Sequence, residues 1–299
     1  RRRPSARVSS GPGAGMKSEA AYAFRKRQGR AMFALTAACA AATLSLLFVI
    51  LGYIAWHGFS SLNWDFFTRL PKPVGVAGGG IANAIVGSAK VVGLAALLGI
   101  PVGVLGGVWL AEYGNNRLGF CVRYAADVLS GVPSIVIGVF AYALLVQPMK
   151  RFSALSGSVA LAFIIIPMIL RSTEEFVRLV PGAIREAGLA LGLARWKVTL
   201  RIVLPTASRG ILTASLLALS RAAGETAPLI FTAFGNRFWD KGLLHPIATL
   251  PMAIYTYAIS PYADWHRQAW AAALILMLVV LGVNLAARAV LGRQTGAAR

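Results

Sequence analysis

Six apolar stretches, each at least 19 residues long, constrain the fold of this chain more than any other feature of its sequence. They cover residues 31–56, 81–110, 128–149, 152–170, 210–234 and 268–287. A hydrocarbon core about 30 Å thick needs about 20 apolar helical residues, because lipid offers the backbone polar groups no other partners. The sequence therefore predicts an all-α integral membrane protein with six transmembrane helices.

The distribution of positive charge predicts the orientation of these helices. Lys and Arg number 30 against 10 Asp and Glu, an excess that in a soluble protein would indicate nucleic-acid binding, but 57% of the residues are hydrophobic. With six spans, 21 of the 30 cations fall on one side, nine of them in residues 1–30. The positive-inside rule then places both termini in the cytoplasm. We expect residues 1–30 to be a disordered basic tail and residues 291–299 to be a second cytoplasmic tail.

A further uncharged segment, residues 242–263, contains three prolines. We expect a broken, interfacial or re-entrant segment there and no seventh span. The chain has no phosphate-binding P-loop, and its two cysteines and three histidines have no spacing typical of a metal site or a catalytic site. We therefore expect neither ATP hydrolysis nor a metal in this chain.

Small residues recur in the second apolar stretch. Gly99, Gly103 and Gly107 are spaced four apart, which forms a ridge on one helix face. Such ridges allow close approach of a neighbouring helix, so we expect a bundle of packed helices.

The fifth apolar stretch carries two charges near its middle. Arg221 and Glu225 are four residues apart and are expected on one face of one helix, with Arg221 about 16 Å into the membrane at 1.5 Å per residue. Charges at that depth are costly and rarely face lipid. Two interpretations stay open: an ion pair that fixes helix register, or a lining of a translocation route in which the guanidinium binds an oxyanion.

The connection at residues 171–209 is longer than joining two helices requires. Apolar residues at helical spacing predict a short amphipathic helix in it, followed by a basic helical stretch that ends near Pro205. This segment is either an interfacial helix on anionic lipid or a docking helix for a cytoplasmic partner.

The same connection resembles the EAA loop of ABC importer permeases, E-A-A-x3-G-x9-I-x-L-P. The matching residues are Glu186, Ala187, Gly192, Ile202, Leu204 and Pro205, and Gly188 stands where the family usually has alanine. The resemblance implies a type I importer fold in which this loop is the coupling helix that inserts into a cleft of an ATP-binding subunit. We expect the exchange at Gly188 to soften the helix by about 1 kcal/mol at most, without loss of docking.

The segment R-A-A-G-E-T-A-P-L-I-F-T-A at residues 221–233 is similar to the corresponding segment of PstA-type phosphate permeases. Shorter matches are G-V-P-S-I-V at 131–136, L-A-E-Y at 110–113 and S-P-Y at 260–262. The resemblance implies a permease subunit, not an enzyme, of an ATP-driven phosphate importer in the bacterial plasma membrane, with Arg221, Glu225 and Thr226 on the substrate pathway.

The resemblance also implies the partners. These are a PstC-like second permease, two ATP-binding subunits that hold ATP and Mg²⁺, and a phosphate-binding protein; this chain itself is expected to bind no cofactor. The alternatives are an importer permease for another oxyanion, such as sulfate or molybdate, and a secondary carrier without an ATPase.

Overall fold

The computed structural model describes residues 13–73, 76 and 78–296, and their regular secondary structure is helical, apart from one isolated bridge between Phe234 and Ile247. Contacts within the chain divide it into two units, residues 1–55 and residues 56–299. The predicted all-α membrane fold is confirmed. Five described helices are long and apolar enough to cross a membrane, and there are six such spans if a sharply bent pair of helices is counted as one.

Helix α1 (Gly13–Phe59) makes up the described part of the first unit and continues to Phe59. Within Phe24–Phe59, an 18-residue window has a mean hydropathy of 2.3, and residues 31–56 carry no charge on any side, as expected for a helix surrounded by lipid. The prediction of a disordered tail over residues 1–30 is wrong for residues 13–30, which are helical; residues 1–12 lie outside the described part. Residues 16–30 are mostly Ala, Glu, Lys, Arg and Gln, which favour continuation of the helix.

The second unit is a helical bundle built around α7 (Ala154–Arg178). In its most apolar window α7 is 67% buried, against 28% for α3 (Ala82–Tyr113), so α7 is the central helix. Helices α3, α10 (Leu204–Ala223) and α4 (Arg117–Gly131) pack around it, and α13 (Ala263–Gly296) packs on α10 and α12 (Leu250–Ala258).

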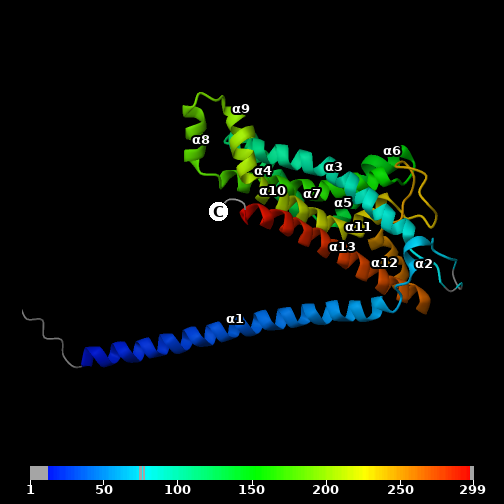
Figure 1. The fold of residues 1–299 in the computed structure, drawn as a ribbon, viewed down its shortest axis with the longest axis horizontal. Helices are drawn as coiled ribbons and strands as arrows, with labels where there is room; N and C mark the ends of the chain where they lie inside the picture. Colours follow the sequence, from blue (N-terminus) through cyan, green and yellow to red (C-terminus); the bar gives the residue numbers. More distant parts are fainter. Residues whose placement is uncertain (1–12, 74–75, 77, 297–299) are drawn as a thin grey trace, which may run out of the picture. The chain divides into compact units, whose positions relative to one another are not determined.

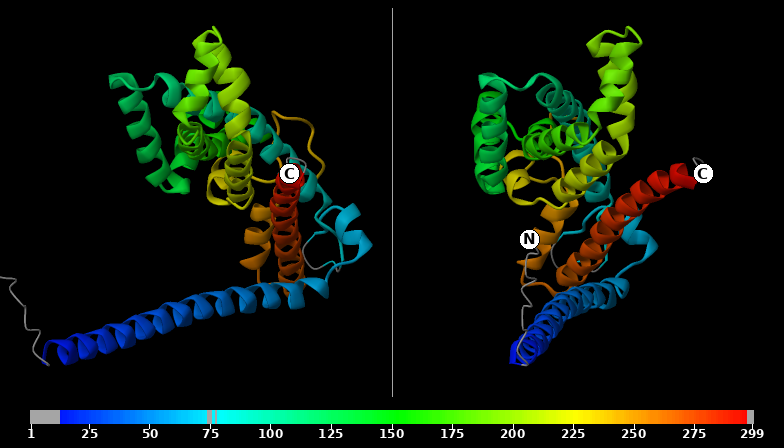
Figure 2. Two further views of the ribbon diagram at one scale, coloured as in Figure 1. Left: turned by 60° about the vertical axis from the view of Figure 1, so that its left-hand side comes forward. Right: turned by 90° about the vertical axis from the view of Figure 1, so that its left-hand side faces the viewer.

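The two ends of this bundle differ in structure. The short helices α8 (Gly182–Ala190) and α9 (Arg195–Val198) lie at one end, and α2 (Trp64–Thr68) and α12 lie at the other (Figure 1). In both views of Figure 2 the α8–α9 hairpin, coloured yellow-green, protrudes beyond the neighbouring helices of the bundle. The long connection between the fourth and fifth spans therefore forms a separate projecting structure.

The glycine ridge of α3 lies against α7. Gly99, Gly103 and Gly107 are all buried, and a Cβ atom on each would lie within 3 Å of an atom of α7. At Gly107 that atom is the backbone carbonyl oxygen of Leu170, at 2.5 Å. Only glycine at these positions permits the observed approach of the two helices.

We expect Gly107→Ala to destabilise the bundle by about 1–3 kcal/mol, because a backbone carbonyl cannot move aside as a side chain can. Thermal unfolding in detergent, followed by size-exclusion chromatography, measures this loss. The matched control is Gly93→Ala on the same helix, where nothing lies within 4 Å of the added Cβ. Equal stability of both variants would contradict the packing argument.

Two of the predicted continuous spans are broken in the structure. The predicted span 128–149 falls in α4 and α5 (Ser134–Ala141), which are followed by the π-helix η1 (Tyr142–Val146) and α6 (Gln147–Met149), with a 106° bend between α4 and the later helices. The bend lies at Val132 and Pro133, because a residue before proline disfavours helical backbone and Val132 is extended. The predicted span 210–234 ends at Ala223 of α10, and a short α11 (Ala227–Thr232) follows.

The fourth and fifth spans also have other boundaries than predicted. Helix α7 continues to Arg178 instead of ending at residue 170, and the fifth span begins near Arg195, through α9 and the π-helix η2 (Thr199–Val203), instead of at residue 210. The connection between these two spans is therefore shorter than the predicted 171–209. It runs from the end of α7 to the start of α9 and contains α8. Residues 242–263 contain only the nine-residue α12, about 14 Å long by helix rise, as expected for a segment that does not span.

Candidate functional site

A cavity of about 280 Å³ lies at the middle of the bundle, where the two broken spans meet. The break between α4 and α5 supplies Gly131, Val132, Pro133 and Ser134 to its wall, and the end of α10 supplies Arg221 with Glu225 just beyond it. The two breaks are held together by a close contact, since a Cβ on Gly138 of α5 would lie 2.6 Å from Pro228 Cα of α11. The G-V-P-S and R-A-A-G-E-T-A-P segments of the sequence thus form one site.

Arg221 and Glu225 lie close together, but not on one face of one helix as predicted. Helix α10 ends at Ala223 with Gly224 as its cap, so Glu225 lies past the helix end and not one turn further along the same face. Gly224 is a poor helix former, and Pro228 starts the next helix. The Arg221 Nε to Glu225 Oε1 distance is 3.8 Å.

The exposure of the two side chains differs. The Arg221 side chain is 62% exposed in the isolated subunit, whereas that of Glu225 is 20% exposed. An ion pair this long and this exposed contributes little stability, so most donors of the guanidinium stay available to a ligand. Thr226, the third predicted residue, precedes α11 as its N-cap, makes no side-chain capping hydrogen bond and lies outside the cavity lining.

Helix α8 has an inner face that packs and an outer face that is exposed. Gly188 is buried, and a Cβ there would lie 3.0 Å from both Ile202 Cδ1 and Val198 Cγ2. Glycine at this position therefore lets α8 pack tightly on η2 and α9. Glu186 and Ala187 are exposed, as are Leu189 at 40% and Leu191 at 81%.

Gly192 ends α8 in a left-handed conformation with φ +78°, and its N–H donates to the Leu189 carbonyl oxygen. Residues with a side chain are strained in that region, so glycine sets the reversal between α8 and α9. Ile202 packs in the cluster beneath α8, Leu204 joins the same cluster, and Pro205 lies exposed in the first turn of α10.

Arg185 holds α8 against the bundle, a role that the sequence did not predict. Its Nε and Nη2 lie 3.1 Å and 3.0 Å from Glu112 Oε1 at the end of α3. Its Nη2 also donates to the Val177 carbonyl oxygen at 2.7 Å, and Nη1 donates to that of Val180. Arg185 therefore links α8 directly to the ends of both α3 and α7.

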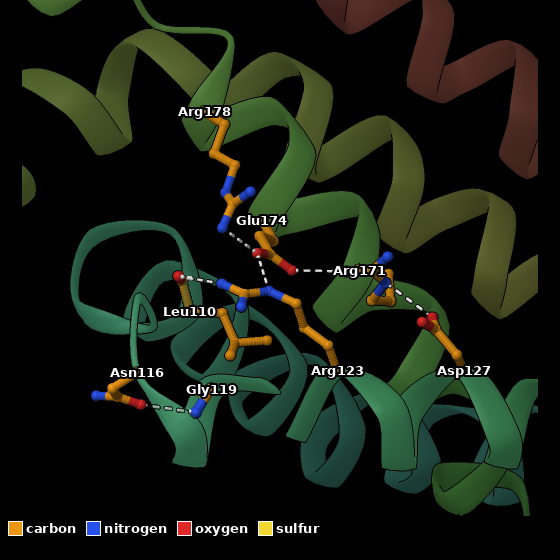
Figure 3. Close-up of polar contacts among 8 residues, drawn as sticks. All are labelled: Leu110, Asn116, Gly119, Arg123, Asp127, Arg171, Glu174 and Arg178. Carbon is orange, nitrogen blue, oxygen red and sulfur yellow. Dashed lines mark hydrogen bonds and ion pairs between the residues drawn. The ribbon is translucent and has the colours of Figure 1, made fainter. Parts of the chain in front are cut away.

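A buried carboxylate forms a second charged cluster near the same end (Figure 3). Glu174 of α7 is 1% exposed, and its oxygens lie 2.6 Å from Arg123 Nε and 2.8 Å from both Arg171 Nη1 and Arg178 Nη2. Arg171 also pairs with Asp127 of α4 at 2.9 Å. This Glu174 cluster joins α4 to α7 one to two helix turns from the cavity.

The sequence contained part of the signal for this cluster. Arg171 and Arg178 lie three before and four after Glu174, which is the spacing of neighbours on one helix face. Arg123 lies 51 residues from Glu174 in the chain, so no local spacing in the sequence predicts their contact.

Comparison with known proteins agrees with the fold. Residues 103–295 match the sequence profile of the binding-protein-dependent transport system inner membrane components. Among solved structures, a bacterial alginate ABC transporter aligns with a TM-score of 0.62 at 15% identity over 87% of this chain and 93% of that chain. A MetNI methionine ABC transporter in inward-facing conformations aligns with a TM-score of 0.59 at 18% identity over 70% and 95%.

The bundle, the broken spans around a charged cavity and the projecting α8 define the membrane permease of a binding-protein-dependent transporter. More narrowly, the phosphate transport system permease protein PstA of Xylella fastidiosa is 44% identical over 283 residues, 93% of this chain and 98% of that protein. PstA of Yersinia pestis is 40% identical over 91% and 92%. The chain belongs to the PstA family of permease proteins, whose members are named as transport proteins and not as enzymes.

Proposed function

We propose that this chain is the permease subunit through which an ATP-driven importer carries phosphate across the plasma membrane. The observation that carries this proposal is the position of Arg221, an arginine held by one long ion pair at the edge of the cavity that the two broken spans line. Its planar donors match the oxygens of a tetrahedral oxyanion. The PstA relatives support phosphate as that oxyanion.

Within the cavity the charged pair acts as an exchangeable contact. Glu225 holds Arg221 when no anion is present, and an arriving phosphate replaces that contact with shorter, charge-assisted hydrogen bonds. A single arginine gives moderate affinity, so the anion is also released. Thr226 lies next to Glu225, between α10 and α11, and its place on the same pathway is part of this proposal.

The proposed partners explain the projecting end of the bundle. The exposed residues of α8, Glu186 and Ala187, would contact an ATP-binding subunit, and Gly188, Gly192, Ile202, Leu204 and Pro205 keep α8 in position for it. Two such subunits would hold the ATP and Mg²⁺, so no cofactor is assigned to this chain. A PstC-like permease would complete the pathway, and a phosphate-binding protein would deliver the substrate at the opposite end.

We propose the orientation that the cations favour, with α8, α9 and both termini in the cytoplasm. Arg195, Lys197 and Arg201 lie at the α8 end of the bundle, where the positive-inside rule expects them. The end that carries α2 and α12 then faces outward, toward the binding protein.

Gly192→Val is expected to uncouple transport from the ATPase. A β-branched residue at φ +78° costs about 1–2 kcal/mol or more, which disfavours the observed end of α8 about 5- to 30-fold. Recovery of ATP-binding subunits with affinity-purified permease measures the effect. Gly182→Ala in the same segment is the control, since nothing lies within 4 Å of its Cβ; equal recovery from both variants would contradict this role.

Uptake by cells that depend on this gene tests the substrate. Cells that carry the gene are expected to accumulate radiolabelled phosphate and to show no gain in sulfate uptake over cells without it. Rescue of sulfate uptake alone would reject phosphate and favour the permease of another oxyanion importer.

A further inference from the structure

A second cavity, of about 230 Å³, lies at the end of the bundle opposite α8. The first turn of α3, the loop after α11 and helix α12 form its walls, through residues that include Asn83, Arg237, Thr256 and Tyr257. Pockets for organic ligands usually measure about 300–1,000 Å³, so this outer cavity is the size for a small ion with some water. The outer cavity and the Arg221 cavity have no lining residue in common.

Asn83, a lining residue of this outer cavity, has a hydrogen-bond acceptor that is not used. The residue is 5% exposed, and its Nδ2 donates to the Asn236 carbonyl oxygen at 2.6 Å, which fixes the orientation of the amide. Its Oδ1 is buried and has no hydrogen-bond partner among the described residues. A buried acceptor without a partner costs about 1–3 kcal/mol, so the geometry favours a ligand that brings a donor.

Arg237 supplies positive charge to the same cavity. Its guanidinium lies 5.3 Å from the centroid of the Trp265 ring, and among the described residues no carboxylate lies within 4 Å of it. Stacking on an indole orients the guanidinium without neutralising it. The N-terminal turn of the 32-residue α3 adds the positive end of its dipole.

Tyr257 completes the polar lining. The phenol is buried, and its ring lies 4.9 Å from the Trp265 ring between centroids, tilted by 42°. Burial raises the pKa of Tyr257, while the charge of Arg237 lowers it to a smaller extent. The hydroxyl therefore stays protonated and able to donate, as does the hydroxyl of Thr256. The outer cavity thus combines a guanidinium and hydroxyl donors with one amide acceptor.

We propose that this outer cavity is an entry site for phosphate that still carries a proton, with Arg237 paired to its charged oxygens and Asn83 Oδ1 accepting from its P–OH group. The proposal rests on the proposed function, because it names the first contact of the same substrate with this subunit. Sulfate has no proton to donate at neutral pH and would leave Asn83 without a partner. The unpaired acceptor therefore discriminates between the two ions at the entrance.

Phosphodiester head groups of lipids share the charge of phosphate but lack the P–OH donor. A lipid would therefore satisfy Arg237 and not Asn83. Dimethyl phosphate, which has the charge and no P–OH group, separates these two sources of the same chemistry.

Equilibrium binding of radiolabelled phosphate to the purified transporter complex, without its binding protein, tests the site. The Arg221→Ala background removes the contribution of the central cavity. In that background we expect Arg237→Gln and Asn83→Leu each to weaken phosphate binding by about tenfold or more. Arg237 is exposed, so Arg237→Gln tests the site even if Asn83→Leu fails to fold.

Two matched controls accompany these variants. Arg267→Gln removes an arginine from the start of α13 that lies outside the cavity lining, and Thr249→Val removes a buried hydroxyl without a partner that also lies outside it. Both are expected to bind phosphate within twofold of the background. Dimethyl phosphate and sulfate are expected to compete at least tenfold more weakly than phosphate.

Three results would each overturn the proposal. They are unchanged phosphate binding by Arg237→Gln, no phosphate binding by the Arg221→Ala background itself, and equal competition by dimethyl phosphate. The last result would favour a lipid site. ATP-driven uptake by the wild-type complex separates this result from the proposed function. Uptake of phosphate with no effect of Arg237→Gln rejects only the entry site, whereas binding at the outer cavity without any uptake rejects only the transport function.

Discussion

Replacing Arg221 with alanine is expected to reduce phosphate uptake by about 10- to 100-fold while the complex still assembles. Hydrogen bonds to a charged group are worth about 1.5–3 kcal/mol, and loss of that amount from the barrier gives this range. Assembly persists because the side chain is 62% exposed and its one ion pair is 3.8 Å long. Initial rates of uptake, together with the recovery of the partner subunits, measure both effects.

The control for this variant is Arg151→Ala. Arg151 is an exposed cation in the turn before α7, outside the cavity, so its removal changes the charge of the protein without changing the pathway. Loss of the complex in Arg221→Ala, with Arg151→Ala intact, would show instead that Arg221 and Glu225 serve to hold helices in register.

The second large effect is expected from Glu174→Gln. The substitution leaves Arg123, Arg171 and Arg178 around a neutral amide that is almost fully buried. Breaking a buried ion pair by removing one partner costs about 3–5 kcal/mol, a large part of the stability of a typical domain. We expect the variant protein to be recovered at low yield and to unfold at a lower temperature in detergent.

Glu175→Gln is the matched control, because this neighbouring carboxylate is exposed on the other face of α7. It is expected to behave as the wild type in the same unfolding measurement. If Glu174→Gln were as stable as Glu175→Gln, the Glu174 cluster would not hold α4 against α7.

The sequence predicted the helices well because lipid requires long apolar segments with satisfied backbones. It placed Gly99, Gly103 and Gly107 on one face, and that face lies against α7. The local pattern also predicted a short amphipathic helix within residues 181–194, and α8 (Gly182–Ala190) is there. Each of these features depends on residues close together in the chain.

The breaks and the charged clusters were not predictable in the same way. Pro133 is present in the sequence, but membrane helices often tolerate proline, so it did not predict a break. The packing of α5 on α11 stabilises the 106° bend. Arg185 meets Glu112 across 73 residues, and Asn83 meets Asn236 across 153. Such pairs arise from the tertiary arrangement, for which one sequence gives no periodic signal.

Reconstitution of the complex that co-purifies with this chain tests the transport function and its energy source together. The complex is expected to contain ATP-binding subunits and, in liposomes with a phosphate-binding protein, to accumulate phosphate only when ATP is present on the α8 side of the membrane. Accumulation of phosphate without ATP, or purification of the chain with no ATP-binding subunit, would contradict its assignment as the permease of an ATP-driven phosphate importer.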